Sequence, residues 1–259
     1  MGKYSHILLC SDLDGTLLDK EGKMSGENID AIKYFCAEGG KFCIATGRLP
    51  SHLLQFADKD FFKCPIICSN GAAIYDFEKD EVLYSRPLGK KLPDLVDFLE
   101  KNSGHVLETT LFVNLEKVMC IGFSESIERI REHINQTVYK IVMRTDSPES
   151  AVTLRDRLKV YFGADFNFSR SWDTGVEILD AHATKGDTIG KLKEILGGGY
   201  FCICVGDYEN DITMIEKADL GCAVANAVPE VKRAAGRVVC SNNESAIKYI
   251  VENICGEVK

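Results

Sequence analysis

The sequence has no long apolar run, and no stretch of it approaches the ~18 apolar residues that a membrane-spanning helix needs. It also lacks an N-terminal apolar segment followed by a small-residue cleavage site, so we expect no secretory signal peptide. Positive charge is scarce, because 31 Lys and Arg stand against 39 Asp and Glu, a formal net charge of −8. A nucleic-acid groove needs clustered basic residues. We therefore expect a cytoplasmic protein whose partner is neither nucleic acid nor a membrane.

The cysteines show no metal-binding spacing. There are 11 of them and no CxxC pair, so the sequence gives little support for a zinc cage. Most lie in apolar runs, as Cys202 and Cys204 do in YFCICVGD. We interpret them as small buried hydrophobic residues in a reducing compartment.

Strand and helix patterns alternate in both outer parts of the chain. Short apolar runs such as HILLC and KFCIAT are typical of buried parallel strands. The helical pattern SGENIDAIKYFCAEGG has Ser25 as its expected N-cap and Gly39 and Gly40 as its expected end. Pro229 is expected to open a late helix. This alternation predicts a parallel sheet with helices on both faces.

The middle of the chain has a different pattern. Helices are expected near residues 92–102, 125–134 and 149–162. Some of the strands between them, such as KVMCIGF and YKIVMRT, leave no room for a crossover helix, so antiparallel pairing is expected. The predicted fold class is α/β, with a Rossmann-like parallel-sheet core and an inserted α+β domain. The predicted domains are a core of residues 1–85 and 184–259 and an insertion of residues 86–183.

Polar motifs follow the apolar strands of the predicted core or open one of its helices. They are SDLDGT after the first strand, ATGR at 45–48, TKGD at 184–187 and GDYEND at 206–211. The carboxyl ends of parallel strands share one edge of a sheet, where ligands bind. Residues from all four motifs should therefore converge there.

Convergence would bring together four carboxylates, those of Asp12, Asp14, Asp207 and Asp211. Such a cluster needs a cation, and oxygen ligands without His or Cys favour Mg²⁺. Donors for phosphate oxygens would surround it: Thr46, Lys185, Asn210 and the backbone N–H groups of the turns at Gly15 and Gly47. The residues thus predict a phosphoryl-transfer site.

Together with SNGA at 69–72, the motifs DLDGTLL, ATGR, TKGD and GDYENDITMI resemble the ordered motifs of the haloacid dehalogenase (HAD) superfamily. More narrowly, they resemble its Cof-type, or IIB, sugar-phosphatase-like branch. The resemblance covers the whole chain, including the place between SNGA and TKGD where a C2B cap domain is inserted. It implies a HAD-like core, a cap that determines substrate specificity, and a phosphoric monoester hydrolase.

The resemblance also implies a role for each matching position. Asp12 would be the nucleophile that forms an aspartyl-phosphate, and Asp14 the general acid and then the general base. Asp12, the Asp14 backbone carbonyl and Asp207 would hold Mg²⁺, with Asp211 acting through water. The phosphate ligands would be the Leu13 N–H, Thr46, Gly47, Lys185 and Asn210, with Asn70 orienting Asp12 or the substrate. Arg48 is interpreted as a solvent-facing residue.

The expected function is Mg²⁺-dependent hydrolysis of a small phosphorylated metabolite, a sugar phosphate by the family resemblance. Pyridoxal phosphate and nucleotides stay open as substrates. A phosphomutase shares the Asp12 and Asp14 pair and also stays open, because the two activities differ in how well water is excluded. From another class, a phosphoacceptor signalling module also gathers acids, a Thr and a Lys at a sheet edge. Receiver domains of that kind are nearer half the length of this chain. The sequence does not indicate an oligomeric state.

Overall fold

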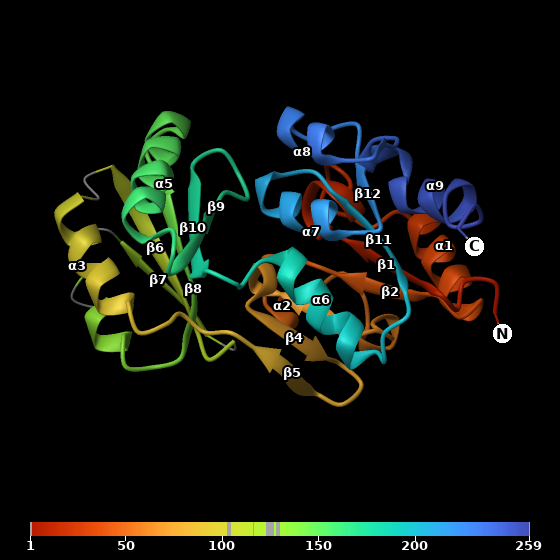
Figure 1. Ribbon diagram of the computed structural model, residues 1–259, viewed down its shortest axis with the longest axis horizontal. Helices are drawn as coiled ribbons and strands as arrows, with labels where there is room; N and C mark the ends of the chain where they lie inside the picture. The colour runs from red at the N-terminus through yellow and green to blue at the C-terminus, as the bar shows by residue number, and fades with distance from the viewer. Residues whose placement is uncertain (1, 103–104, 116, 123–126, 128–129, 259) are drawn as a thin grey trace. The chain divides into compact units, whose positions relative to one another are not determined.

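The computed structural model describes residues 2–102, 105–115, 117–122, 127 and 130–258. The chain forms two compact units, coloured along the sequence in Figure 1. They consist of Met1–Tyr84 with Lys185–Lys259, here called the core unit, and of Ser85–Thr184, here called the inserted unit. These bounds differ by one residue from the domain boundaries expected above.

The core unit is built on a five-stranded parallel sheet in the order β13-β12-β11-β1-β2. The strands are β1 (Ile7–Ser11), β2 (Lys41–Ile44), β11 (Phe201–Gly206), β12 (Leu220–Ala223) and β13 (Arg237–Val238). All five residues of β1 are buried, as expected for a strand covered on both faces. A smaller sheet contains β3 (Ile66–Cys68), β4 (Ala73–Asp76) and β5 (Glu81–Ser85).

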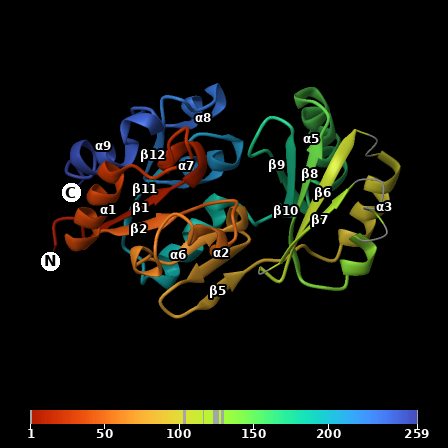
Figure 2. The same ribbon diagram turned by 180° about the vertical axis from the view of Figure 1, so that it is seen from behind.

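Helices cover both faces of the parallel sheet (Figures 1 and 2). They are α1 (Gly26–Ala37), α2 (Pro50–Leu53), α6 (Lys185–Ile195), α7 (Ile212–Lys217), α8 (Pro229–Ala234) and α9 (Ala246–Asn253). Helix α1 packs against α9, whereas α7 packs against α6 and α8. Two helix-start predictions are confirmed, since Ser25 accepts a hydrogen bond from the Asn28 N–H at 3.1 Å and Pro229 lies in the first turn of α8.

The inserted unit has a five-stranded antiparallel sheet in the order β7-β6-β8-β10-β9. Its elements are α3 (Leu92–Asn102), β6 (Val106–Val113), β7 (Lys117–Gly122), β8 (Val138–Thr145), α5 (Pro148–Phe162), β9 (Phe166–Ser169) and β10 (Gly175–Asp180). Residues of α3 and α5 share one hydrophobic core with residues of the sheet. The helix expected near residues 125–134 lies partly outside the described residues.

The fold class is therefore confirmed as a parallel α/β core with an additional α+β unit. In the described part of the chain, no helix combines the length and apolarity needed to cross a membrane.

Candidate active site

The turn after β1 carries the first acidic motif. The Asp12 N–H donates to the Val205 carbonyl on β11 at 2.9 Å, which fixes Asp12 at the edge of the sheet. The chain then turns at Gly15, whose φ of 79° lies in the left-handed region. A Cβ atom at this position would collide with the Asp207 carboxylate. Glycine therefore allows the turn to approach the loop that follows β11.

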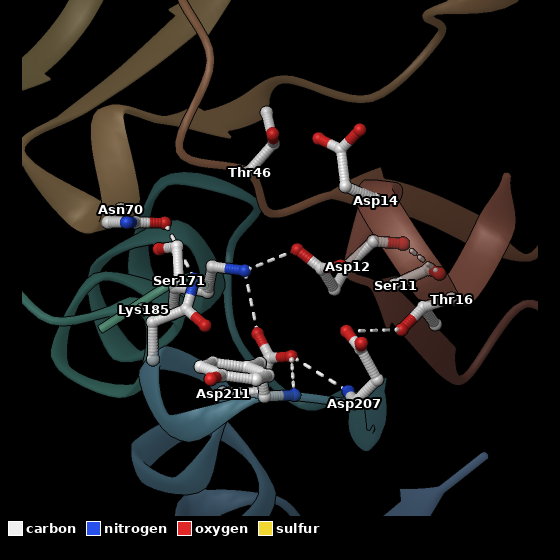
Figure 3. Close-up of polar contacts among 12 residues, drawn as sticks. Ser11, Asp12, Asp14, Thr16, Thr46, Asn70, Ser171, Lys185, Asp207 and Asp211 are labelled. Carbon is white, nitrogen blue, oxygen red and sulfur yellow. Dashed lines mark hydrogen bonds and ion pairs between the residues drawn. The ribbon is translucent and has the colours of Figure 1, made fainter. Parts of the chain in front are cut away.

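Lys185 opens α6 and joins two of the motifs. Its side chain is wholly buried, and its Nζ donates to Asp12 Oδ1 at 2.5 Å and to Asp211 Oδ1 at 2.6 Å (Figure 3). Burying an ammonium group is costly, and a helix N-terminus disfavours a cation. Burial by itself would lower the pKa of Lys185, but the two carboxylates hold it above its ordinary value. The lysine is therefore charged and held between them.

The loop after β11 carries Asp207 and Asp211. Asp211 is fully buried, and its Oδ2 accepts from the backbone N–H groups of Asp207 at 2.9 Å and Tyr208 at 3.2 Å. Both Asp211 oxygens are thus engaged within the protein. Asp207 is only partly buried, and its Oδ1 accepts from Thr16 Oγ1 at 3.2 Å.

Three carboxylates meet around one ammonium group. Ligand oxygens of Asp12, Asp207 and Asp211 lie within 4.8 Å of one another. Burial, reinforced by the charge of Asp211, raises the pKa of Asp12 well above its ordinary range and that of Asp207 to about 7. Lys185 contributes one ammonium group to three carboxyl groups. A set of oxygen ligands with excess negative charge fits a hard divalent cation such as Mg²⁺.

Asp14 points away from this cluster (Figure 3). Its side chain is 54% exposed and forms a bidentate pair with Arg48, whose Nε and Nη2 donate to its two oxygens at 2.8 and 2.7 Å. The Arg48 guanidinium also lies 5.1 Å from the centre of the Phe56 ring. The interpretation of Arg48 as merely solvent-facing was wrong. The signal lay in the pairing of β1 with β2, because their adjacent ends bring the residues that follow them together.

The remaining predicted residues lie at the ends of β2 and β3. Thr46 is buried, and its carbonyl accepts from the Asn70 N–H at 2.9 Å. The Asn70 side chain accepts from Asn210 Nδ2 at 3.1 Å, and a Cβ at Gly47 would lie 3.1 Å from the Asn70 amide. Asn70 has a φ of 56°, a conformation that costs a residue with a side chain about 1 kcal/mol or more. Leu13 is buried in the core, so its backbone is what it can offer a ligand.

All of these residues belong to the core unit, and comparisons with known proteins agree with its fold. The family model of haloacid dehalogenase-like hydrolases matches residues 9–251. The chain is 30% identical to YxeH of Bacillus subtilis (strain 168), over 95% of this chain and 97% of that protein. It is 25% identical to the pyridoxal phosphate phosphatase YbhA of Escherichia coli (strain K12), over 94% of this chain and 97% of that one.

Solved structures share the whole architecture. That of the HAD subclass IIB sugar phosphatase BT4131 superimposes with a TM-score of 0.79 at 22% identity, over 96% of this chain and 99% of that one. The family predicted from the motifs is thus confirmed by a match to most of the chain. The chain belongs to the haloacid dehalogenase-like hydrolases, and its enzyme class is that of the phosphatases.

Proposed function

We propose that the enzyme is a Mg²⁺-dependent phosphatase that hydrolyses a small phosphate ester through an aspartyl-phosphate on Asp12. The observation that carries this proposal is the meeting of Asp12 and Lys185, 173 residues apart, in a buried ion pair beside Asp207 and Asp211. We further propose a sugar phosphate as substrate, because the motifs resemble those of the sugar-phosphatase-like branch. The inserted unit would then determine which leaving group, that is, which alcohol part of the phosphate ester, the enzyme accepts.

The proposed chemistry has two steps. In the first, an Asp12 carboxylate oxygen attacks phosphorus, the ester P–O bond breaks, and the exposed Asp14, once protonated from solvent, gives its proton to the departing oxygen. In the second, Asp14 takes a proton from water, whose oxygen attacks phosphorus and releases phosphate from Asp12. The different surroundings of the two residues support this division of roles, because Asp12 is buried in the carboxylate cluster whereas Asp14 is exposed in the turn that follows the same strand.

The proposed Mg²⁺ ligands are Asp12, the Asp14 backbone carbonyl and Asp207. When bound, the ion would offset the excess negative charge and polarise the phosphoryl group. Asp211 is proposed to act through water, because both of its oxygens are already engaged by Lys185 and by backbone N–H groups.

The proposed phosphate ligands are the Leu13 and Gly47 N–H groups, Thr46, Lys185 and Asn210. Fixed donors of this kind stabilise charge on the equatorial oxygens during transfer. Asn70 would orient two of them, because it accepts from Asn210 and lies against Gly47.

A panel of phosphate esters tests the proposal, with Mg²⁺ and then with EDTA. It should include hexose phosphates, pyridoxal phosphate and nucleoside monophosphates. Phosphate release from hexose phosphates that EDTA abolishes is the expected result. Release from pyridoxal phosphate alone would overturn the sugar-phosphate proposal, and isomerised hexose phosphate without free phosphate would indicate a phosphomutase. A stable phosphoprotein without turnover would indicate a phosphoacceptor module.

Asp207→Asn should stabilise the metal-free protein while removing its response to Mg²⁺. Burial raises the pKa of Asp207 to about 7, so its charged form costs stability at pH 8. We expect the neutral amide to raise the free energy of unfolding in EDTA by about 1–3 kcal/mol. Thermal unfolding at pH 8, with and without Mg²⁺, measures both effects. A lower melting temperature in EDTA than that of the wild type would contradict the electrostatic argument.

Arg48→Ala should slow the hydrolysis of esters with poor leaving groups more than the hydrolysis of esters with good leaving groups. The bidentate pair holds Asp14, and a proton donor matters most when the departing oxygen is basic. We expect kcat on a hexose phosphate to fall by about 10–10²-fold and kcat on p-nitrophenyl phosphate to change far less.

Two further variants complete the Arg48 experiment. Arg48→Lys should not restore the rate, because an ammonium group cannot form the two-pronged contact. Arg233→Ala, which removes another surface arginine with an acidic partner, is the matched control. Equal losses of kcat on both substrates would show that Arg48 does not act through Asp14.

A further inference from the structure

Three buried cysteines form a cluster outside the candidate active site. Cys10 lies on β1, and Cys202 and Cys204 lie on β11, each with at most 1% of its surface exposed. Their sulfur atoms lie within 4.8 Å of one another, and those of Cys202 and Cys204 are 3.6 Å apart. Cys10 pairs in register with Cys204, so the three side chains share one face of the parallel sheet.

The spacing fits a single metal ion with three sulfur ligands. Three atoms no more than 4.8 Å apart surround a point that lies within about 2.8 Å of each. A metal–thiolate bond is ~2.3 Å long, so modest side-chain rotation would close the site. The cysteines of the cluster lie on β1 and β11, two paired strands that are far apart in the sequence. The cluster therefore has no short motif such as CxxC by which the sequence could indicate it.

The ligand set indicates which ion. Sulfur ligands alone select soft ions such as Cu(I). A fourth thiol, that of Cys43 on β2, pairs in register with Cys10 but lies outside the group of sulfurs that are within 4.8 Å of one another. Zinc in a structural site takes four ligands, whereas this group, as found among the described residues, has three sulfurs and neither nitrogen nor oxygen. We propose that Cys10, Cys202 and Cys204 bind one Cu(I) ion within the core sheet. Each thiol that binds as a thiolate releases its proton to the buffer, and the copper stays Cu(I), so no oxidant or reductant is consumed.

The cluster lies next to the strand ends that carry the active-site residues. Cys10 precedes Asp12 by two residues, and the Asp12 N–H is bonded to Val205, the neighbour of Cys204. An ion that pulls β1 and β11 together at this point should displace Asp12 relative to Lys185. We therefore expect bound Cu(I) to inhibit the enzyme, a consequence that rests on the proposed function, whereas the binding itself does not.

Anaerobic titration with Cu(I), in competition with a chromogenic Cu(I) chelator, tests the binding on the full chain. The wild type should retain one Cu(I), and X-ray absorption should show three sulfur neighbours. Cys202→Ala should weaken binding by about 100-fold or more, because one of three bonds is lost. The matched control is Cys222→Ala. Cys222 is equally buried on β12, but it pairs with Val205 and so lies on the opposite face of the sheet.

Unchanged Cu(I) affinity in Cys202→Ala would overturn the proposal, and so would nitrogen or oxygen neighbours in the wild type. The X-ray absorption measurement needs no variant, so it decides the question even where a substitution impairs folding. Activity is measured separately, and copper-loaded wild type should lose at least about half of its phosphatase rate. If the copper-free protein has no phosphatase activity, the proposed function is wrong, but the proposal that the three cysteines bind Cu(I) is unaffected.

Discussion

Asp12→Asn should lower kcat by about 10⁴–10⁶-fold on the best substrate of the panel, because an amide cannot displace the leaving group from phosphorus. The fold should survive, since the amide oxygen can still accept from the Lys185 ammonium group. The substitution also removes one of three crowded negative charges. We therefore expect the free energy of unfolding in EDTA to stay the same or to rise. Steady-state kinetics and rapid-quench detection of phosphorylated protein measure the catalytic loss.

A matched control separates charge from chemistry in the Asp12 experiment. Asp30→Asn removes a carboxylate from the exposed surface of α1 and should leave kcat unchanged. Mass spectrometry of the Asp12→Asn protein should exclude deamidation back to aspartate. Activity within about tenfold of the wild type, in a preparation shown to be intact, would mean that another residue attacks phosphorus.

Lys185→Met should destabilise the metal-free protein more than any other substitution proposed for the site. Without its ammonium group, Asp12 and Asp211 remain buried without a compensating charge, and breaking a buried pair typically costs about 3–5 kcal/mol. Loss of a positive charge at the transferring phosphate should also lower kcat by about 10²–10³-fold. Urea unfolding in EDTA measures the first effect, and steady-state kinetics with saturating Mg²⁺ measure the second.

A double substitution tests the electrostatic reason for this loss. Asp211→Asn keeps an oxygen for the Asp207 and Tyr208 N–H groups and removes one of the stranded charges. Added to Lys185→Met, it should restore part of the stability but none of the activity. Lys191→Met, at a half-exposed position of the same helix, should change stability by no more than about 0.5 kcal/mol. Wild-type stability of Lys185→Met in EDTA would contradict the buried pair.

Local patterns were sufficient for much of the fold. The apolar run before Asp12 predicted β1, and Ser25 and Pro229 predicted helix starts that the structure confirms. These signals depend on residues within one turn of helix or a few residues of strand, so they can be recognised without knowing the tertiary contacts. The parallel direction of the core strands followed from the alternation of strands and helices in the sequence, because short connections between elements allow few arrangements.

The sequence by itself determined the family, the α/β class with its inserted α+β unit, and the set of polar residues at the ends of the core strands. Only the tertiary structure decided which of those residues touch. It placed Lys185 between Asp12 and Asp211, and it paired Asp14 with Arg48. It also brought the sulfur atoms of three cysteines, which the sequence analysis interpreted as buried hydrophobic residues, into one cluster. The physical reason is that such contacts depend on the register between strands far apart in the chain and on side-chain direction. The spacing of residues along the sequence shows neither the register between distant strands nor the direction of a side chain.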